Sequence, residues 1–135
     1  MNVARNILEC IGDTPLLALR HVVPKNGARI LIKVESENPT GSLKDRMALA
    51  MIEAAEADGR LKPGGPVVEY TGGSTGVSLS LVCGVKGHPL HIVTSDAFAR
   101  EKLQHMSALG ATLNTIALLP DVYSASLVFH AIDAA

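Results

Sequence analysis

The sequence predicts an α/β fold, in which a mostly parallel sheet carries helices on both faces in three αβα layers. Short apolar runs typical of buried strands alternate with longer segments of helical periodicity. Turns rich in glycine and proline separate them. The chain has 135 residues and is 47% apolar, which is enough for one core. The predicted strands are 30–35, 67–70, 90–94 and 112–118, and the predicted helices are 43–58, 75–85 and 98–109.

The first predicted helix follows a sharp break in the chain. The turn residues 38–41 (Asn-Pro-Thr-Gly) end the strand pattern of residues 30–35. Ser42 with Asp45 three residues later is typical of a capping box, in which each residue's side chain bonds the other's backbone N–H. A long apolar run follows. Lys44 therefore belongs to the first turn of a helix.

Lys44 is a candidate for covalent chemistry. The positive end of the helix dipole disfavours an extra proton at this place. A lysine that loses its proton can form an imine with a carbonyl compound. The alternative is an ordinary solvated lysine in a first helical turn.

The predicted strand 67–70 leads into a loop of three glycines and three hydroxyl residues, Thr71-Gly72-Gly73-Ser74-Thr75-Gly76. Glycine lets a backbone approach a ligand closely, and a helix N-terminus attracts an anion. The loop therefore suits a carboxylate or a phosphate. It lacks the Gly-Lys-Ser/Thr ending of a P-loop and the G-x-G-x-x-G spacing of a dinucleotide site. The alternative is a plain strand-to-helix turn.

The remaining elements place this loop at a ligand-binding edge. The strands 90–94 and 112–118 flank the helix 98–109, so the chain continues the alternation of strand and helix. Ligands in such sheets bind beyond the carboxyl ends of the strands. The loop 71–76 lies at such an end.

Together and in this order, the two segments resemble the cysteine synthase and cystathionine β-synthase family. These are pyridoxal-phosphate (PLP) enzymes of fold type II, the group that includes threonine synthase and the tryptophan synthase β chain. The family's Asn-Pro-x-x-Ser-x-Lys-Asp-Arg run carries its Schiff-base lysine, which falls on Lys44. Its Thr-Ser-Gly-Asn-Thr-Gly loop falls on 71–76. The resemblance extends upstream to Gly-x-Thr-Pro-Leu at 12–16 and downstream to 99–104 and 109–111.

The resemblance implies a transferase or lyase of cysteine biosynthesis, with PLP as cofactor. An amino acid such as O-acetylserine would lose acetate and gain sulfide or another thiol. Lys44 would hold PLP and, once free, remove the Cα proton. Ser74 would lie near the ring oxygen of the cofactor. The substrate carboxylate would be bound by Thr71, Gly72, Gly73 and Thr75. The motifs leave open a cystathionine β-synthase or a Ser/Thr dehydratase.

The chain departs from the family pattern at two loop positions and in length. Ser74 stands where the family has asparagine, and Gly72 where it has serine. Both departures put the substrate in doubt. Family members are much longer, and no glycine follows Gly110 to form a second phosphate cradle.

The resemblance also implies a domain organisation. Residues 1–37 would belong to the large domain and residues 38–118 to a small α/β domain. Residues 119–135 are apolar nearly all round a helix, which indicates a truncated or frame-disrupted product. We therefore expect this chain alone to be inactive and a full-length form to be a homodimer. The alternative is an inactive product with only an association role.

Composition excludes several other classes of function. The net charge of −1 favours neither nucleic acid nor an acidic membrane surface. The sequence has no signal peptide and no apolar run long enough to span a membrane, so we expect a cytoplasmic protein. Cys10 and Cys83 form no metal motif. The histidines at 88, 91 and 105 lack a completing ligand at a usual spacing, so no metal site is predicted.

Overall fold

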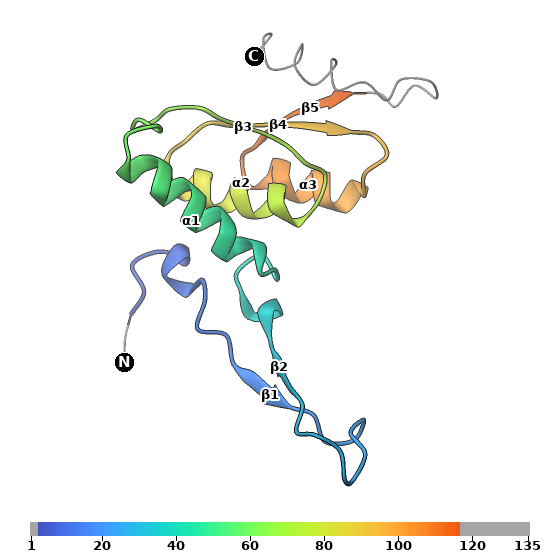
Figure 1. The fold of residues 1–135 in the computed structure, drawn as a ribbon. Helices are drawn as coiled ribbons and strands as arrows, with labels where there is room; N and C mark the ends of the chain where they lie inside the picture. Colours follow the sequence, from blue (N-terminus) through green and yellow to red (C-terminus); the bar gives the residue numbers. More distant parts are fainter. Residues whose placement is uncertain (1–2, 117–135) are drawn as a thin grey trace.

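A computed structural model describes residues 3–116 of the chain (Figure 1). The N-terminal part contains the 3-10 helix η1 (Ile7–Cys10), the strands β1 (Leu16–Ala18) and β2 (Leu31–Lys33), and the 3-10 helix η2 (Glu35–Glu37). The part that follows contains α1 (Lys44–Ala57), β3 (Val67–Tyr70), α2 (Ser74–Lys86), β4 (Leu90–Ser95), α3 (Arg100–Ala108) and β5 (Thr112–Ile116).

Strands β3, β4 and β5 form a parallel sheet with β4 in the middle. Helix α2 connects β3 to β4, and α3 connects β4 to β5, so each connection is a crossover of the kind that parallel strands require. Five of the six β4 residues are buried, as is typical of the central strand of a parallel sheet. The predicted α/β class with a parallel sheet is confirmed.

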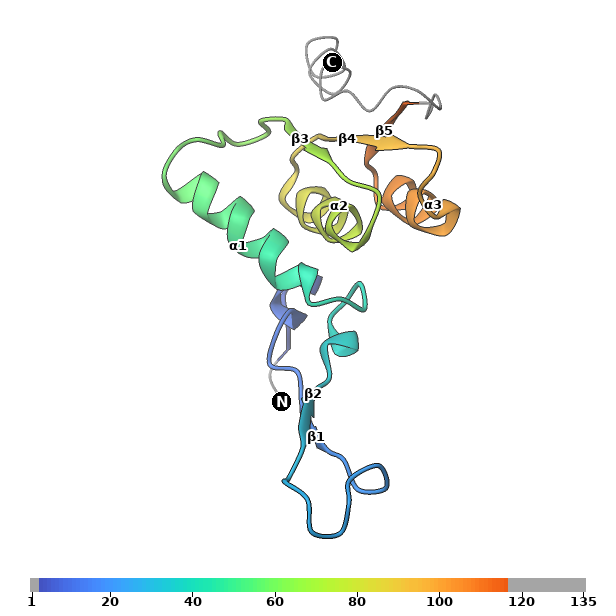
Figure 2. The same ribbon diagram turned by 45° about the vertical axis from the view of Figure 1, so that its right-hand side comes forward.

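The described helices lie to one side of this sheet. Figure 1 shows α2 and α3 beneath the same face, and Figure 2 shows α1 beside α2. The described residues thus supply two of the three predicted layers. The second helical layer is not among them.

The core lies between α2, α3 and the sheet. Its largest side chains, Leu79, Ile92 and Met106, are at most 1% exposed, and burying each contributes about 1.5–3 kcal/mol. A Cβ at Gly76 would lie 2.8 Å from the Met106 side chain, so α2 and α3 pack closely only because position 76 has no side chain. Helix α1 joins this core through Ala48 and Ile52. The same hydrophobic core therefore supports both α1 and α2.

Most predicted element bounds agree with the structure to within two residues. The strand predicted at 30–35 is observed at 31–33 as β2, but it pairs antiparallel with β1 and does not belong to the parallel sheet. Strand β1 is not apparent from the sequence pattern. The predicted strand 112–118 is observed to Ile116, and the tail 119–135 lies outside the described residues.

The β1–β2 hairpin extends away from the α/β part (Figure 1). It exposes apolar side chains. Leu16 is 63% exposed and Leu17 is 53% exposed. No helix among residues 3–116 is both long and apolar enough to cross a membrane. The assignment of residues 1–37 to a large domain stays a prediction.

Candidate functional site

Lys44 is the first residue of α1 and is partly buried. Its backbone N–H donates to the Ser42 hydroxyl at 3.1 Å, which fixes the start of the helix. Its side-chain amine makes no hydrogen bond or ion pair within residues 3–116. The structure thus presents an unpaired amine at a helix start, as the sequence predicts for this position.

Asp45, the next residue, is buried and ties this helix start to the rest of the site. Its carboxylate accepts a hydrogen bond from the Thr40 N–H at 2.8 Å, another from the Thr40 hydroxyl, and a third from the Ser78 hydroxyl at 2.5 Å. The predicted capping box with Ser42 is wrong. The turn at 39–41 brings Thr40 to the carboxylate, so Asp45 bonds this residue and a residue of α2.

The loop 71–76 runs from the end of β3 into the first turn of α2. Gly73 is the N-cap residue, and its N–H donates to Thr71 Oγ1 at 3.3 Å. The first N–H groups of α2 have no acceptor within the helix. The hydroxyls of Ser74 and Thr75 make no hydrogen bond within the described part of the chain. Donors for an anion therefore converge at this helix start.

The structure brings the two sequence motifs together. Ser78 lies one turn into α2 and Asp45 lies beside Lys44, so their hydrogen bond joins the starts of the two helices. Figure 1 shows both helix starts on the side where the strands of the sheet end. Around Gly73 there is open space, because a Cβ built there meets no atom within 4 Å. A free amine, an open loop and anion donors fit a ligand that has both an aldehyde and an anionic group, as PLP does.

A second polar network joins the segment 11–16 to α1, and sequence reasoning missed it. Arg46 Nε donates to Glu35 Oε2 at 2.9 Å, and Arg46 Nη2 donates to Thr14 Oγ1 at 2.9 Å. Asn38 accepts from the Gly12 N–H at 3.0 Å and donates to the Glu35 carbonyl at 2.9 Å. The two motifs at 12–16 and 38–46 were the signal in the sequence for this region, but local spacing does not show that they bond each other. The network joins the start of α1 to Thr14 and Glu35.

Glu35 gives this network a pH dependence that can be measured. Hydrogen bonds from Arg46, then Thr14, lower the pKa of Glu35 from 4.5 to about 2. A depressed carboxyl pKa adds stability above the unfolded value, and this stability is lost as the pH falls from about 4.5 toward about 2. We therefore expect Glu35→Gln to flatten the acid side of a plot of thermal midpoint against pH.

The control for this prediction is Glu37→Gln, since Glu37 is an exposed neighbour outside the network. Its plot should follow that of the parent between pH 5 and 2. An unchanged acid slope in Glu35→Gln would show that the network does not keep Glu35 ionised.

His88, Glu56 and Cys83 are titratable groups that lie outside the candidate site. His88 is buried, with Nδ1 at 3.0 Å from the Gly65 carbonyl and Nε2 at 3.0 Å from Glu56. Hydrogen bonds from His88 and then Lys86 lower the pKa of Glu56. Burial raises the pKa of the Cys83 thiol to about 11. Among residues 3–116 no three His, Cys, Asp or Glu side chains are placed to hold a metal ion.

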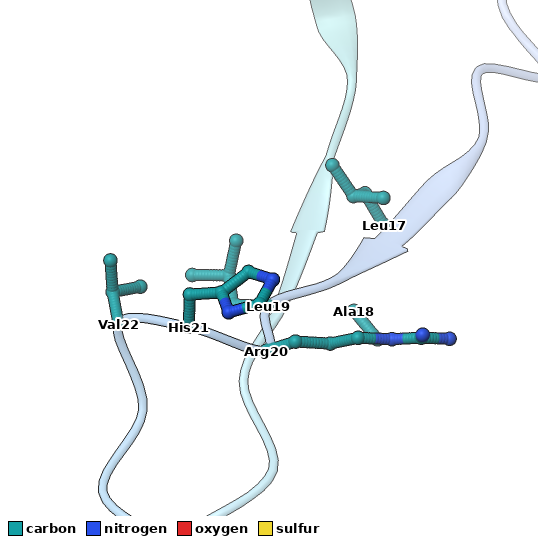
Figure 3. Close-up of a pocket in the computed structure, with 6 residues that line it drawn as sticks. All are labelled: Leu17, Ala18, Leu19, Arg20, His21 and Val22. Carbon is teal, nitrogen blue, oxygen red and sulfur yellow. The ribbon is translucent and has the colours of Figure 1, made fainter.

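An open pocket of about 450 Å³ lies on the hairpin and not at Lys44 (Figure 3). Residues 17–22 line it, and the surface that they present to the pocket is almost entirely apolar. A catalytic site needs convergent polar groups. The helix starts of α1 and α2 supply such groups and the hairpin does not, so the candidate site is the helix starts.

Known proteins are similar to this chain in sequence. A family model described as pyridoxal-phosphate dependent enzyme matches residues 7–129. The cysteine synthase of Staphylococcus aureus (strain N315) is 45% identical over 108 residues, which are 80% of this chain and 35% of that protein. The chain therefore spans about a third of the length of the curated relatives that it matches.

Solved structures share the fold. The structure of O-ureido-L-serine synthase matches with a TM-score of 0.87 at 33% identity, over 98% of this chain and 42% of that one. A cysteine synthase from Entamoeba histolytica matches with a TM-score of 0.80 at 40% identity, over 84% of this chain and 35% of that one.

Proposed function

The chain belongs to the pyridoxal-phosphate dependent enzyme family, and we propose that it carries the lysine and the amino-acid-binding loop of a cysteine-synthase-like enzyme. The reaction would convert O-acetylserine and sulfide to cysteine and acetate. The observation that supports the proposal is the Asp45–Ser78 hydrogen bond, which joins the start of α1, where Lys44 lies, to the first turns of α2, which follow the loop 71–76. The similarity to cysteine synthases supports the choice of reaction.

The two helix starts would have different roles. The start of α1 would hold the cofactor, and the start of α2 would bind the substrate carboxylate. Lys44 Nζ would hold the cofactor and, once released, would accept the proton from the substrate Cα as general base. When bound, PLP supplies an electron sink for the charge left on Cα. The N–H groups at the start of α2, with Thr71, Gly72, Gly73 and Thr75, would bind the substrate carboxylate. Ser74 would bond the ring oxygen of the cofactor.

A chimera tests this function directly. Residues 1–111 would replace the matching part of the S. aureus cysteine synthase, which supplies the rest of the protein. We expect this chimera to release cysteine from O-acetylserine and sulfide, whereas residues 1–135 alone should form no stable visible band with PLP and no cysteine. Turnover by residues 1–135 would show that the chain is sufficient by itself.

The same assay separates the alternatives. Pyruvate from serine would indicate a Ser/Thr dehydratase, and cystathionine from serine and homocysteine would indicate a cystathionine β-synthase. A soluble chimera that binds PLP but forms none of these products would favour the inactive, association-only alternative.

Ser74 is the second test of the loop assignment. Replacing Ser74 with asparagine should preserve or improve the KM for O-acetylserine in the chimera, because asparagine has a longer reach and offers both a donor and an acceptor. One neutral hydrogen bond is worth about 1 kcal/mol, so the change should stay within about fivefold. Loss of turnover in Ser74→Asn would mean that the loop alignment or the substrate is wrong.

The proposal extends to assembly and location. We propose that the full-length enzyme forms a homodimer in the cytoplasm and uses a small amino acid with sulfide or another thiol as its partners. Light scattering on the chimera tests the oligomeric state, and fractionation of cells that express the native gene tests the location.

A further inference from the structure

The ring of Phe98 lies where a side chain at position 72 would be. A Cβ built on Gly72 would lie 1.9 Å from Phe98 Cγ, 2.1 Å from its Cδ2 and 2.3 Å from its Cδ1. Real Cβ atoms do not approach other atoms so closely, and the base of an aromatic ring cannot swing aside as a flexible chain end can. Gly72 and Phe98 are therefore a matched pair, in which the ring occupies the volume that a side chain at 72 would need.

Phe98 also joins two loops at the carboxyl edge of the sheet. Its ring packs edge-on against Tyr70, the last residue of β3, with the ring centroids 6.5 Å apart and the planes at 65°. Its own segment follows β4, where the Phe98 N–H donates to the Ser95 carbonyl at 3.3 Å. The Ala97 N–H donates to the Ser95 hydroxyl at 3.2 Å. The ring thus connects the loop after β4 to the loop that begins α2.

The pair changes the chemistry of the anion-binding loop. The resemblance described for this sequence has a serine at position 72, and here an aromatic ring stands in place of that hydroxyl. The polar donors that remain are the first N–H groups of α2 and the unpaired hydroxyls of Ser74 and Thr75. The ring, which is 38% exposed, thus presents an apolar surface at position 72, where the family's loop has a hydroxyl.

We propose that Phe98 is a positioning residue for the carboxylate of the amino-acid substrate. By packing on Gly72 it holds the loop 71–76 in the conformation that directs its N–H and hydroxyl donors at one anion. This inference rests on the proposed function, since it names a further determinant of the same site. In this chain the Phe98 ring would support the carboxylate site at position 72, where the family has a serine hydroxyl.

Binding of L-alanine to the PLP-loaded chimera tests the proposal, because this ligand carries the carboxylate and has no leaving group on Cβ. Calorimetry should give a Kd about tenfold weaker for Phe98→Ala, and less than threefold weaker for Phe98→Leu, which keeps most of the apolar volume. Gly72→Ser should also weaken binding about tenfold, because its Cβ displaces the ring. The double variant Gly72→Ser/Phe98→Ala should bind more tightly than either single variant, since the space then accommodates the hydroxymethyl group.

Two controls separate positioning from simple loss of stability. Met51→Ala removes a half-exposed apolar side chain of α1 and should leave the Kd unchanged. L-Alaninamide, which lacks the carboxylate, should bind equally weakly to parent and variants. A merely structural Phe98 would lower the thermal midpoint of Phe98→Ala without moving the Kd of the folded protein.

Each remaining outcome decides the question. Equal affinity of the parent and Phe98→Ala for L-alanine overturns the role of Phe98 and leaves the proposed function standing. A double variant no better than the single variants overturns the matched pair. A parent protein that binds PLP but no amino acid overturns the proposed function itself, and this inference with it.

Discussion

Replacing Asp45 with alanine will destabilise the fold by about 3 kcal/mol, because it removes a buried acceptor that three donors share. The Asp45 carboxylate is fully buried, and it receives hydrogen bonds from the Thr40 N–H, the Thr40 hydroxyl and the Ser78 hydroxyl. Alanine removes the acceptor of all three donors, although the Thr40 and Ser78 hydroxyls lie 3.3 Å apart and can still bond each other. Because Ser78 is fully buried, its hydroxyl cannot turn to solvent instead.

Denaturant unfolding measures this loss, with Asp58→Ala as the matched control. Asp58 is exposed at the end of α1, and within residues 3–116 its side chain pairs only with Arg60, so its removal should change the free energy of unfolding by less than about 1 kcal/mol. Asp45→Asn should lie between the two, because the amide keeps an acceptor for the Thr40 N–H and the hydroxyls can rotate to accept from its NH₂ group. Equal stability of Asp45→Ala and Asp58→Ala would contradict the proposed connection between the helix starts.

Replacing Lys44 with alanine will reduce cysteine formation by the chimera by roughly 10³-fold or more, because it removes both the cofactor's attachment point and the general base. Lys44 makes no hydrogen bond or ion pair within residues 3–116, so the fold should keep its thermal midpoint. A large loss of rate without a loss of stability is the pattern expected of a residue that acts on the substrate.

Two further variants sharpen this prediction. Lys44→Arg keeps the positive charge at the helix start but offers no amine for imine formation, so it should be as inactive as Lys44→Ala. Lys62→Ala removes an exposed lysine of the loop after α1 and should keep full activity. Activity in Lys44→Arg would mean that the charge of this residue is what matters.

Local patterns were sufficient to predict most elements of the α/β part. Helix α1 and strand β3 agree closely with prediction because turn residues mark their ends and a periodic apolar pattern fills them. Strand β1 was missed because the three residues between Pro15 and Leu19 are too few to show an alternation of apolar and polar side chains. Its stability comes from pairing with β2, which only the fold reveals.

The candidate site shows the same division between local and long-range information. Sequence spacing indicated Lys44 at a helix start and an anion-binding loop at 71–76. It indicated neither the Asp45–Ser78 hydrogen bond nor the packing of Phe98 on Gly72, because each joins residues far apart in the chain. The helix predicted to begin at 98 begins at Arg100, which leaves Phe98 in the turn that faces the loop.

The most direct test of the central claim is to find which lysine binds PLP. The chimera would be loaded with PLP, reduced with borohydride, digested and mapped by peptide mass. The account predicts a single phosphopyridoxyl adduct on the peptide that carries Lys44, and none in Lys44→Ala. An adduct on Lys33 or Lys62 with Lys44 unmodified would contradict it.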